Sequence, residues 1–349
     1  NTLKPLDTEK SIYSQVAWNE EGTALACLKG VTPKGKSYRQ NKILLYTIPQ
    51  TADGRYEYDP AADTSFPENQ VISENRAPGF TVDNSLILFG IREQDEKVEK
   101  KKDDPPVANV DIWHWNDERI QSQQMKQAAR DKRFTYLSSV VVGESRFIRI
   151  ADSTMRHAEV SRDGRWVIGR NDKPYISDYN ESMSDYYRVN PYTGERTLIV
   201  KAHKRDLGFS PDSKNFLFWK DGEVWNYILS SGSLYSVTEK SDAQFENQEF
   251  DYARERPPYG VAGFTKDGKN VILYSRYDLW LQPLDGKKAS CITNGYGTEN
   301  EIVLRYIQTD RDEKFIDNTK PLLLSATGQW TKKAGFFTLE KGKLKELLY

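Results

Sequence analysis

The sequence predicts an all-β fold made of repeated four-stranded antiparallel sheets, and three observations support this. A hairpin pattern recurs along the chain. Aromatic residues make up 12% of a chain that is only 37% hydrophobic and 29% charged, and glycines stand at regular turn positions. Disordered chains lack such an aromatic content. Many short strands that each bury one face, joined by polar loops, account for this composition.

The repeated hairpin is an apolar strand end, a polar turn and a second, strongly apolar strand. Its copies occupy residues 16–28, 79–91, 158–170, 207–219 and 262–274. The predicted first strands end at Trp18, Phe80, Val160, Phe209 and Phe264. The turns carry Asp83, Asp163, Asp212 and Asp267 at one position. Aspartate hydrogen-bonds the backbone of its own turn, and the glycine that often follows tolerates a positive φ.

A second hairpin follows in several copies, over residues 184–199, 222–238 and 277–293. Each has an aromatic-rich strand, a turn that contains glycine and a polar outer strand. Four antiparallel strands per repeat form the blade of a β-propeller. We therefore predict a single propeller domain over residues 1–349, with six blades at about residues 10–75, 76–153, 154–202, 203–245, 255–294 and 300–349.

The second blade is longer than the others, and we expect an insertion over residues 92–134. Within it, residues 116–134 have a helix-forming composition without Gly or Pro, which predicts a short helix. The opening segment "TLKPLDTEKS" reads as the outer strand of a preceding blade. Because a closed propeller leaves no exposed edge, we expect a parent protein of seven or eight blades that continues past Tyr349.

Several stretches carry a resemblance to a known family. They are "SPDSKNFLFWKDGEVW", "SRDGRWVIGRNDKPY", "TKDGKNVILYSRYDLWLQPLDG" and "NVDIWHWNDERIQSQQ". Together they resemble the N-terminal propeller of bacterial serine peptidases of the prolyl oligopeptidase family, over essentially the whole chain. In that family the propeller caps an α/β-hydrolase domain that holds the catalytic Ser, Asp and His. No position of that triad can be transferred to this chain.

The resemblance implies a non-catalytic domain that gates or shapes the access of peptide substrate to a separate hydrolase domain. Its implied partners are that hydrolase domain and the peptide, and its implied location is periplasmic or exported, with a cytoplasmic one still open. The alternative is a stand-alone TolB-like propeller that serves as a protein-binding scaffold. A third reading, a propeller enzyme acting on glycans through a central metal, also stays open.

The sequence contains few motifs that indicate catalysis, metal binding or cofactor binding. The string "GESRF" around Ser145 lacks the second glycine of the G-x-S-x-G nucleophile elbow, and it lies between two predicted strands. The histidines His114, His157 and His203 lack metal-ligand spacing, and we expect His114 to pack within an aromatic strand. No dinucleotide or phosphate motif is present, so we expect no catalytic residue, cofactor or metal in this chain.

The net charge of −1 gives no reason to expect binding to nucleic acid or to a membrane. Four residues remain as candidate contacts with a substrate or partner. His157 opens the third blade, and Tyr179 lies in the acidic, tyrosine-rich stretch 178–187, which we expect to form a long loop. Two arginines lie in a second expected loop, 251–260. These two are Arg254 and Arg256.

Overall fold

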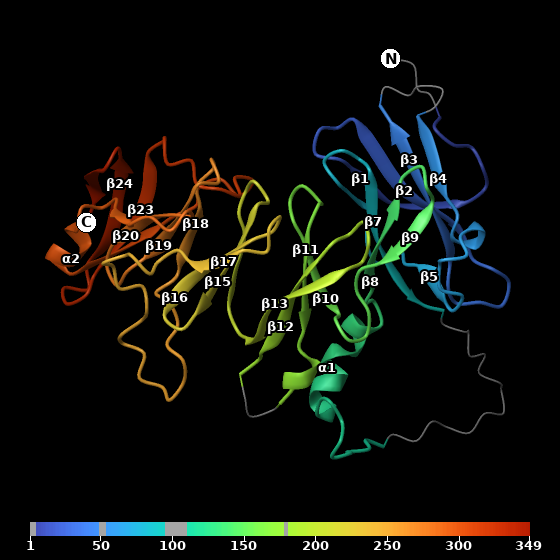
Figure 1. Cartoon of the computed structure of the whole chain (residues 1–349), viewed down its shortest axis with the longest axis horizontal. Helices are drawn as coiled ribbons and strands as arrows, with labels where there is room; N and C mark the ends of the chain where they lie inside the picture. Colours follow the sequence, from blue (N-terminus) through green and yellow to red (C-terminus); the bar gives the residue numbers. More distant parts are fainter. Residues whose placement is uncertain (1–4, 49–53, 95–109, 178–180) are drawn as a thin grey trace. The chain divides into compact units, whose positions relative to one another are not determined.

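A computed structural model describes residues 5–48, 54–94, 110–177 and 181–349. The chain divides into two compact units, unit 1 from Asn1 to Ala202 and unit 2 from His203 to Tyr349. Each unit contains three antiparallel sheets whose strands follow one another in chain order (Figure 1). Five sheets have four strands, and the second has five because its first strand is split in two. The predicted fold class, an all-β chain of six four-stranded blades, is thereby confirmed.

Unit 1 begins with a sheet of β1 to β4, at Ile12–Trp18, Ala24–Val31, Gln40–Thr47 and Arg55–Tyr58. The second sheet comprises β5 to β9, at Gln70–Ile72, Gly79–Phe80, Leu86–Glu93, Tyr136–Val141 and Arg146–Arg149. The third comprises β10 to β13, at His157–Val160, Val167–Asn171, Ser184–Val189 and Arg196–His203. Helix α1 spans Gln121–Asp131, and two 3-10 turns lie at Pro60–Ala62 and Lys173–Tyr175.

Unit 2 begins with β14 to β17, at Asp206–Phe209, Asn215–Lys220, Glu223–Ile228 and Leu234–Ser236. The fifth sheet comprises β18 to β21, at Val261–Phe264, Asn270–Tyr274, Leu279–Pro283 and Ser290–Cys291. The short helix α2, Tyr296–Asn300, precedes the sixth sheet. That sheet comprises β22 to β25, at Ile302–Tyr306, Leu322–Gly328, Ala334–Glu340 and Lys343–Leu348.

The hairpin turns have the predicted chemistry. Asp83 Oδ1 accepts hydrogen bonds from the backbone N–H and the hydroxyl of Ser85, at 3.1 and 2.6 Å. Asp267 Oδ1 accepts equivalent bonds from Lys269 N at 3.1 Å and Thr265 Oγ1 at 2.6 Å. Where the following glycine is replaced, Asn84 adopts the required positive φ of 55°. Each predicted first strand ends at the predicted residue.

The core lies between successive sheets, because alternate side chains of a central strand point to opposite faces. On β7, Ile87 and Phe89 pack against the first sheet, and Leu88 between them packs against the third. On β19, Val271 packs against the fourth sheet and Ile272 against the sixth. Each central strand is therefore apolar on both faces and buries them only by stacking between two neighbours.

Two expectations about loops need correction. Trp113 and Trp115 do not lie in an aromatic strand: they are 65% and 90% exposed, and no strand is assigned there. His114 instead stacks on Trp115 and its Nδ1 accepts a hydrogen bond from Asn116 N. The stretch 178–187 is not wholly a loop, since β12 begins at Ser184.

Part of the predicted insertion, residues 95–109, lies outside the described residues. Among the residues that are described, neither helix is both long and apolar enough to cross a lipid bilayer.

Candidate functional site

The second sheet has a split first strand, and this split forms the candidate site. β5 pairs with the end of β7 and β6 pairs with its beginning, so Ser73–Pro78 bulge away from the sheet between them. The bend begins beside Gly90 of β7, whose carbonyl accepts a hydrogen bond from Ser73 N at 2.8 Å. Glycine inside a strand often marks the close approach of another backbone.

Gly90 has no room for a side chain. A methyl group built there would lie 2.6 Å from Thr135 Oγ1 and 3.0 Å from Arg76 Cβ. The missing side chain allows the bend from one side and the segment before β8 from the other to meet over β7. The bend therefore holds Glu74, Asn75 and Arg76 at the edge of the sheet formed by the split first strand.

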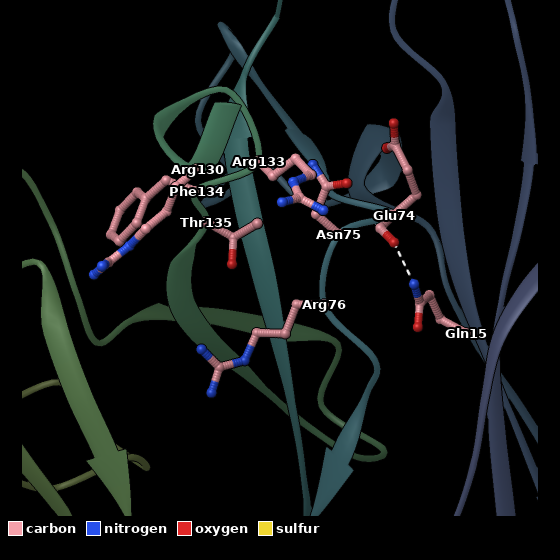
Figure 2. A pocket seen from close by; sticks show the side chains of 8 residues that line it. All are labelled: Gln15, Glu74, Asn75, Arg76, Arg130, Arg133, Phe134 and Thr135. Atoms are coloured by element: carbon pink, nitrogen blue, oxygen red, sulfur yellow. Dashed lines mark hydrogen bonds between the residues drawn. The ribbon is translucent and has the colours of Figure 1, made fainter. Parts of the chain in front are cut away.

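A strained residue of the first sheet holds this bend in place. Gln15 interrupts the register between β1 and β2 as a bulge and has a φ of 55°. A non-glycine residue in this left-handed region is uncommon and costs free energy unless its surroundings stabilise it. The Gln15 side-chain amide donates a hydrogen bond to the backbone carbonyl of Glu74, which supplies part of that stabilisation (Figure 2).

A hollow of about 550 Å³ lies over the bend. It is lined by Gln15, Glu74, Asn75, Arg76, Arg130, Arg133, Phe134 and Thr135 (Figure 2). The last four come from the end of α1 and the segment that leads into β8. Three guanidinium groups and one carboxylate thus share the hollow with two amides, a hydroxyl and an aromatic ring.

The acidic side chains around the hollow have cationic partners, but not every arginine there has an acidic partner. The Glu74 carboxylate accepts a hydrogen bond from Arg92 Nη2 at 3.3 Å. Asp131, next to the hollow, pairs with Arg119 at 3.5 Å and with Arg156 at 3.7 Å. Arg76 has no hydrogen bond or ion pair with any residue that the structure describes, and burial lowers the pKa of its guanidinium.

A second hollow of unit 1, about 570 Å³ in volume, differs from the first in that its cation is paired with acids. It is lined mainly by residues of β3, β5 and the 59–68 loop. The amine of Lys42 in this hollow lies 2.7 Å from Asp59 and 3.1 Å from Glu57. Its cation is therefore already neutralised by the protein, whereas Arg76 is not.

The sequence-predicted contacts are divided between the two units. His157 lies on β10, with Nε2 3.7 Å from Asp172 Oδ2. Burial lowers the pKa of this imidazole, and the charges of Arg170, Arg130 and Arg156 act in the same direction, against Asp172. Tyr179 lies outside the described residues.

Arg254 and Arg256 belong to unit 2, in the loop between β17 and β18. Arg256 donates a hydrogen bond to Gln248 Oε1 at 3.0 Å and lies 3.7 Å from Glu246. Sequence reasoning missed Arg76 and Gly90 altogether. The only available signal was a glycine inside the otherwise apolar run "LILFGI".

Ser145, at the "GESRF" string, lies in the hairpin turn between β8 and β9 with a φ of 49°. Its hydroxyl is 3.2 Å from the hydroxyl of Tyr56. Among the described residues, no three His, Cys, Asp or Glu side chains come together as a metal-binding group.

No family model and no curated protein matches this chain. Solved structures similar to it include propeller-containing peptidases at low identity. Acylaminoacyl peptidase from Pyrococcus horikoshii is 9% identical, with 97% of this chain and 46% of that one covered and a TM-score of 0.35. Dipeptidyl peptidase 4 from Porphyromonas gingivalis is 12% identical, with 97% and 46% covered and a TM-score of 0.43.

The β-propeller domain of the Trilobed protease from Pyrococcus furiosus is 11% identical, with 98% and 99% covered and a TM-score of 0.33. The chain thus spans about half the length of the two peptidases above. These likenesses are weak, and the fold assignment rests on the six sheets themselves.

Proposed function

We propose that this chain is a non-catalytic propeller domain of a serine peptidase, which shapes the access of peptide substrate to a separate α/β-hydrolase domain. The family resemblance of the sequence and the six-bladed fold support this proposal. The observation that carries it is the hollow at Arg76. Two amides, a hydroxyl, an aromatic ring and an arginine with no partner among the described residues match the groups that a peptide presents.

The partners in this proposal are the parent's own hydrolase domain and the peptide. The resemblance to envelope-located bacterial enzymes also leads us to propose a periplasmic or exported parent, which cell fractionation would test. Neither nucleic acid nor a membrane is a partner in this scheme, consistent with the balanced charge of the chain.

The test uses both the parent gene product and this chain. We expect the reading frame to encode a hydrolase domain with a G-x-S-x-G nucleophile elbow after Tyr349. The parent should cleave peptides and spare large folded proteins, and residues 1–349 alone should cleave neither. Hydrolysis that follows residues 1–349 through successive purification steps, or a reading frame without such a domain, would contradict the proposal.

One observation favours the scaffold alternative. Ile112, Trp113 and Trp115 are 73%, 65% and 90% exposed, and clustered exposed apolar side chains often mark protein contacts. A photo-cross-linker at position 115 in living cells distinguishes the two functions. Repeated cross-links to one separately encoded protein would support the scaffold, and cross-links confined to the parent's hydrolase domain would contradict it.

A further inference from the structure

The hollow over the second sheet has more positive charge than the surrounding residues neutralise. Arg76, Arg130 and Arg133 line it, and none of them has an ion pair with a residue that the structure describes. The nearby acids contact other cations, Glu74 contacting Arg92 and Asp131 contacting Arg119 and Arg156. In Figure 2 the Glu74 carboxylate and the Arg76 guanidinium extend in opposite directions, so the Arg76 end of the hollow is cationic.

Arg76 is the cation least exposed to water. Its stem lies against the backbone of Gly90, and its side chain is half-buried, whereas Arg130 and Arg133 are exposed. A cation that loses water without gaining a partner destabilises the fold. Burial of this kind lowers the pKa of the Arg76 guanidinium, and no charge partner contributes in the opposite direction. A bound anion would offset the destabilisation that this unpaired, half-buried cation causes.

The shape of the guanidinium selects among anions. Its planar fork of N–H donors matches a carboxylate through two parallel hydrogen bonds. The neighbouring Gln15, Asn75 and Thr135 carry neutral donors and acceptors suited to peptide groups, and Phe134 offers an apolar surface. A volume of about 550 Å³ is much larger than a single inorganic ion requires and lies within the usual range for organic ligands.

We propose that Arg76, flanked by Arg130 and Arg133, binds a carboxylate group of a peptide in this hollow. The inference rests on the proposed function only in taking a peptide as the occupant. The carboxylate is either the C-terminus of the peptide or the side chain of an Asp or Glu, and the binding experiment below separates these two sources.

The experiment measures binding to the 349-residue protein by isothermal titration calorimetry, with three unlabelled, N-acetylated hexapeptides built on Ala and Gly. The first has a free C-terminus, the second a C-terminal amide, and the third an amide together with one internal Asp. We expect at least one carboxylate-bearing peptide to bind about tenfold or more tightly than the fully amidated one, because a charge-assisted hydrogen-bond pair contributes at least that much. Tighter binding by the first peptide identifies the C-terminus, and tighter binding by the third identifies a side chain.

The variants Arg76→Gln and Arg76→Lys test the assigned group. Arg76→Gln should abolish the preference for the carboxylate peptide, and Arg76→Lys should retain only part of it because it keeps the charge but loses the fork. Arg311→Gln removes an exposed arginine of unit 2 and should leave binding unchanged. Circular dichroism melts establish that each variant is folded, and the carboxylate preference should weaken as salt is raised.

Three results would overturn the inference. They are equal binding of all three peptides, an Arg76→Gln variant that keeps the wild-type preference, and no binding of a carboxylate peptide at millimolar concentration. These results are distinguishable from failure of the proposed function. If the parent has no hydrolase domain, the proposed function is wrong even when Arg76 binds carboxylates. If the parent is a peptidase, the proposed function stands even when Arg76 does not bind them.

Discussion

The second and the fifth sheets begin with the same kind of hairpin, and one of the differences between their second strands concerns the arginine that lies beside it. Phe80 pairs with Ile87 in the second sheet, and Phe264 pairs with Val271 in the fifth. Three residues further along, β7 has Gly90 whereas β19 ends in Tyr274. Because each sheet belongs to a different unit, the comparison concerns the interior of each unit alone.

Tyr274 lies beside Arg305, a half-buried arginine that has several partners. The Tyr274 hydroxyl accepts a hydrogen bond from Tyr306 N at 3.0 Å, and the guanidinium of Arg305 lies 4.5 Å from the centroid of the Tyr274 ring. Arg305 also donates to the carbonyls of Leu304 and Arg276, at 2.7 and 3.1 Å. At Gly90 no ring is present, and Arg76 has no such partner among the described residues. The arginine beside this strand position thus has several partners in the fifth and sixth sheets, whereas the arginine beside Gly90 has none among the described residues.

Removal of the tyrosine ring should have the largest effect. Tyr274→Ala deletes a buried aromatic side chain and should lower the free energy of unfolding of unit 2 by about 3–5 kcal/mol. The matched variant Tyr274→Phe loses only the acceptor for Tyr306 N–H and should cost about 1 kcal/mol. Urea unfolding with hydrogen exchange on peptides from β19 and β22 measures both. Equal losses in the two variants would mean that the ring does not stabilise this sheet.

A methyl group added at Gly90, the position that corresponds to Tyr274, should lower the free energy of unfolding by a smaller amount. Gly90→Ala forces a contact with Thr135 and Arg76 and should destabilise unit 1 by about 1–3 kcal/mol. Gly79→Ala is the control in the same sheet, because a methyl group there would lie 3.7 Å from the nearest atom, Leu88 Cβ. It should change stability by less than about 0.5 kcal/mol. The comparison fails if both variants unfold at the same urea concentration.

The two arginines should respond differently to the same substitution. Arg305→Met removes two hydrogen bonds to carbonyls and the contact with Tyr274, and should cost about 1–2 kcal/mol. Arg76→Met removes a cation with no partner among the described residues, and unit 1 should be as stable as before or slightly more so. Thermal melts of both variants at neutral pH measure this difference. A clear loss of stability in Arg76→Met would show that Arg76 contributes to the fold.

The smallest effect concerns the turn that both sheets share. The hydrogen bond from the Ser85 hydroxyl is the largest cause that lowers the pKa of Asp83 from 3.8 to about 2, and the pKa of Asp267 is lowered in the same direction. A carboxylate with a lowered pKa stabilises the folded state above its unfolded pKa, and this contribution is lost as the pH falls through the folded value. Acid should therefore weaken the Asp83 turn between about pH 4 and pH 2.

The variant Asp83→Asn tests that dependence. It should cost about 0.5–1 kcal/mol at neutral pH, since hydrogen bonds in an exposed turn contribute little. The difference from the wild type should shrink as the pH falls to 2, because the amide does not titrate. Urea midpoints measured across that range give the answer, and a difference that stays constant with pH would contradict the assignment.

The sequence predicted the hairpins well and the site poorly. Phe80, Val160, Phe209 and Phe264 end their strands as expected, because the apolar pattern and the turn aspartate act within a few residues of each other. The expectation of a strand around His114 failed, since the local aromatic pattern there has no neighbouring sheet to pack against among the described residues. His157 was selected as a candidate contact by its position at the start of a blade, and no observation yet tests that choice.

The amino-acid sequence by itself determined the all-β class, the four-stranded repeat and the chemistry of the turns, because these depend on interactions between residues close together along the chain. Only the tertiary structure decided that Gly90 lets Arg76 and Thr135 meet, and that Gln15 holds the bend from another sheet. These contacts join segments that lie far apart in sequence, and no local pattern specifies which distant side chain will face a given strand. Whether an arginine gains a partner therefore depends on how the sheets pack.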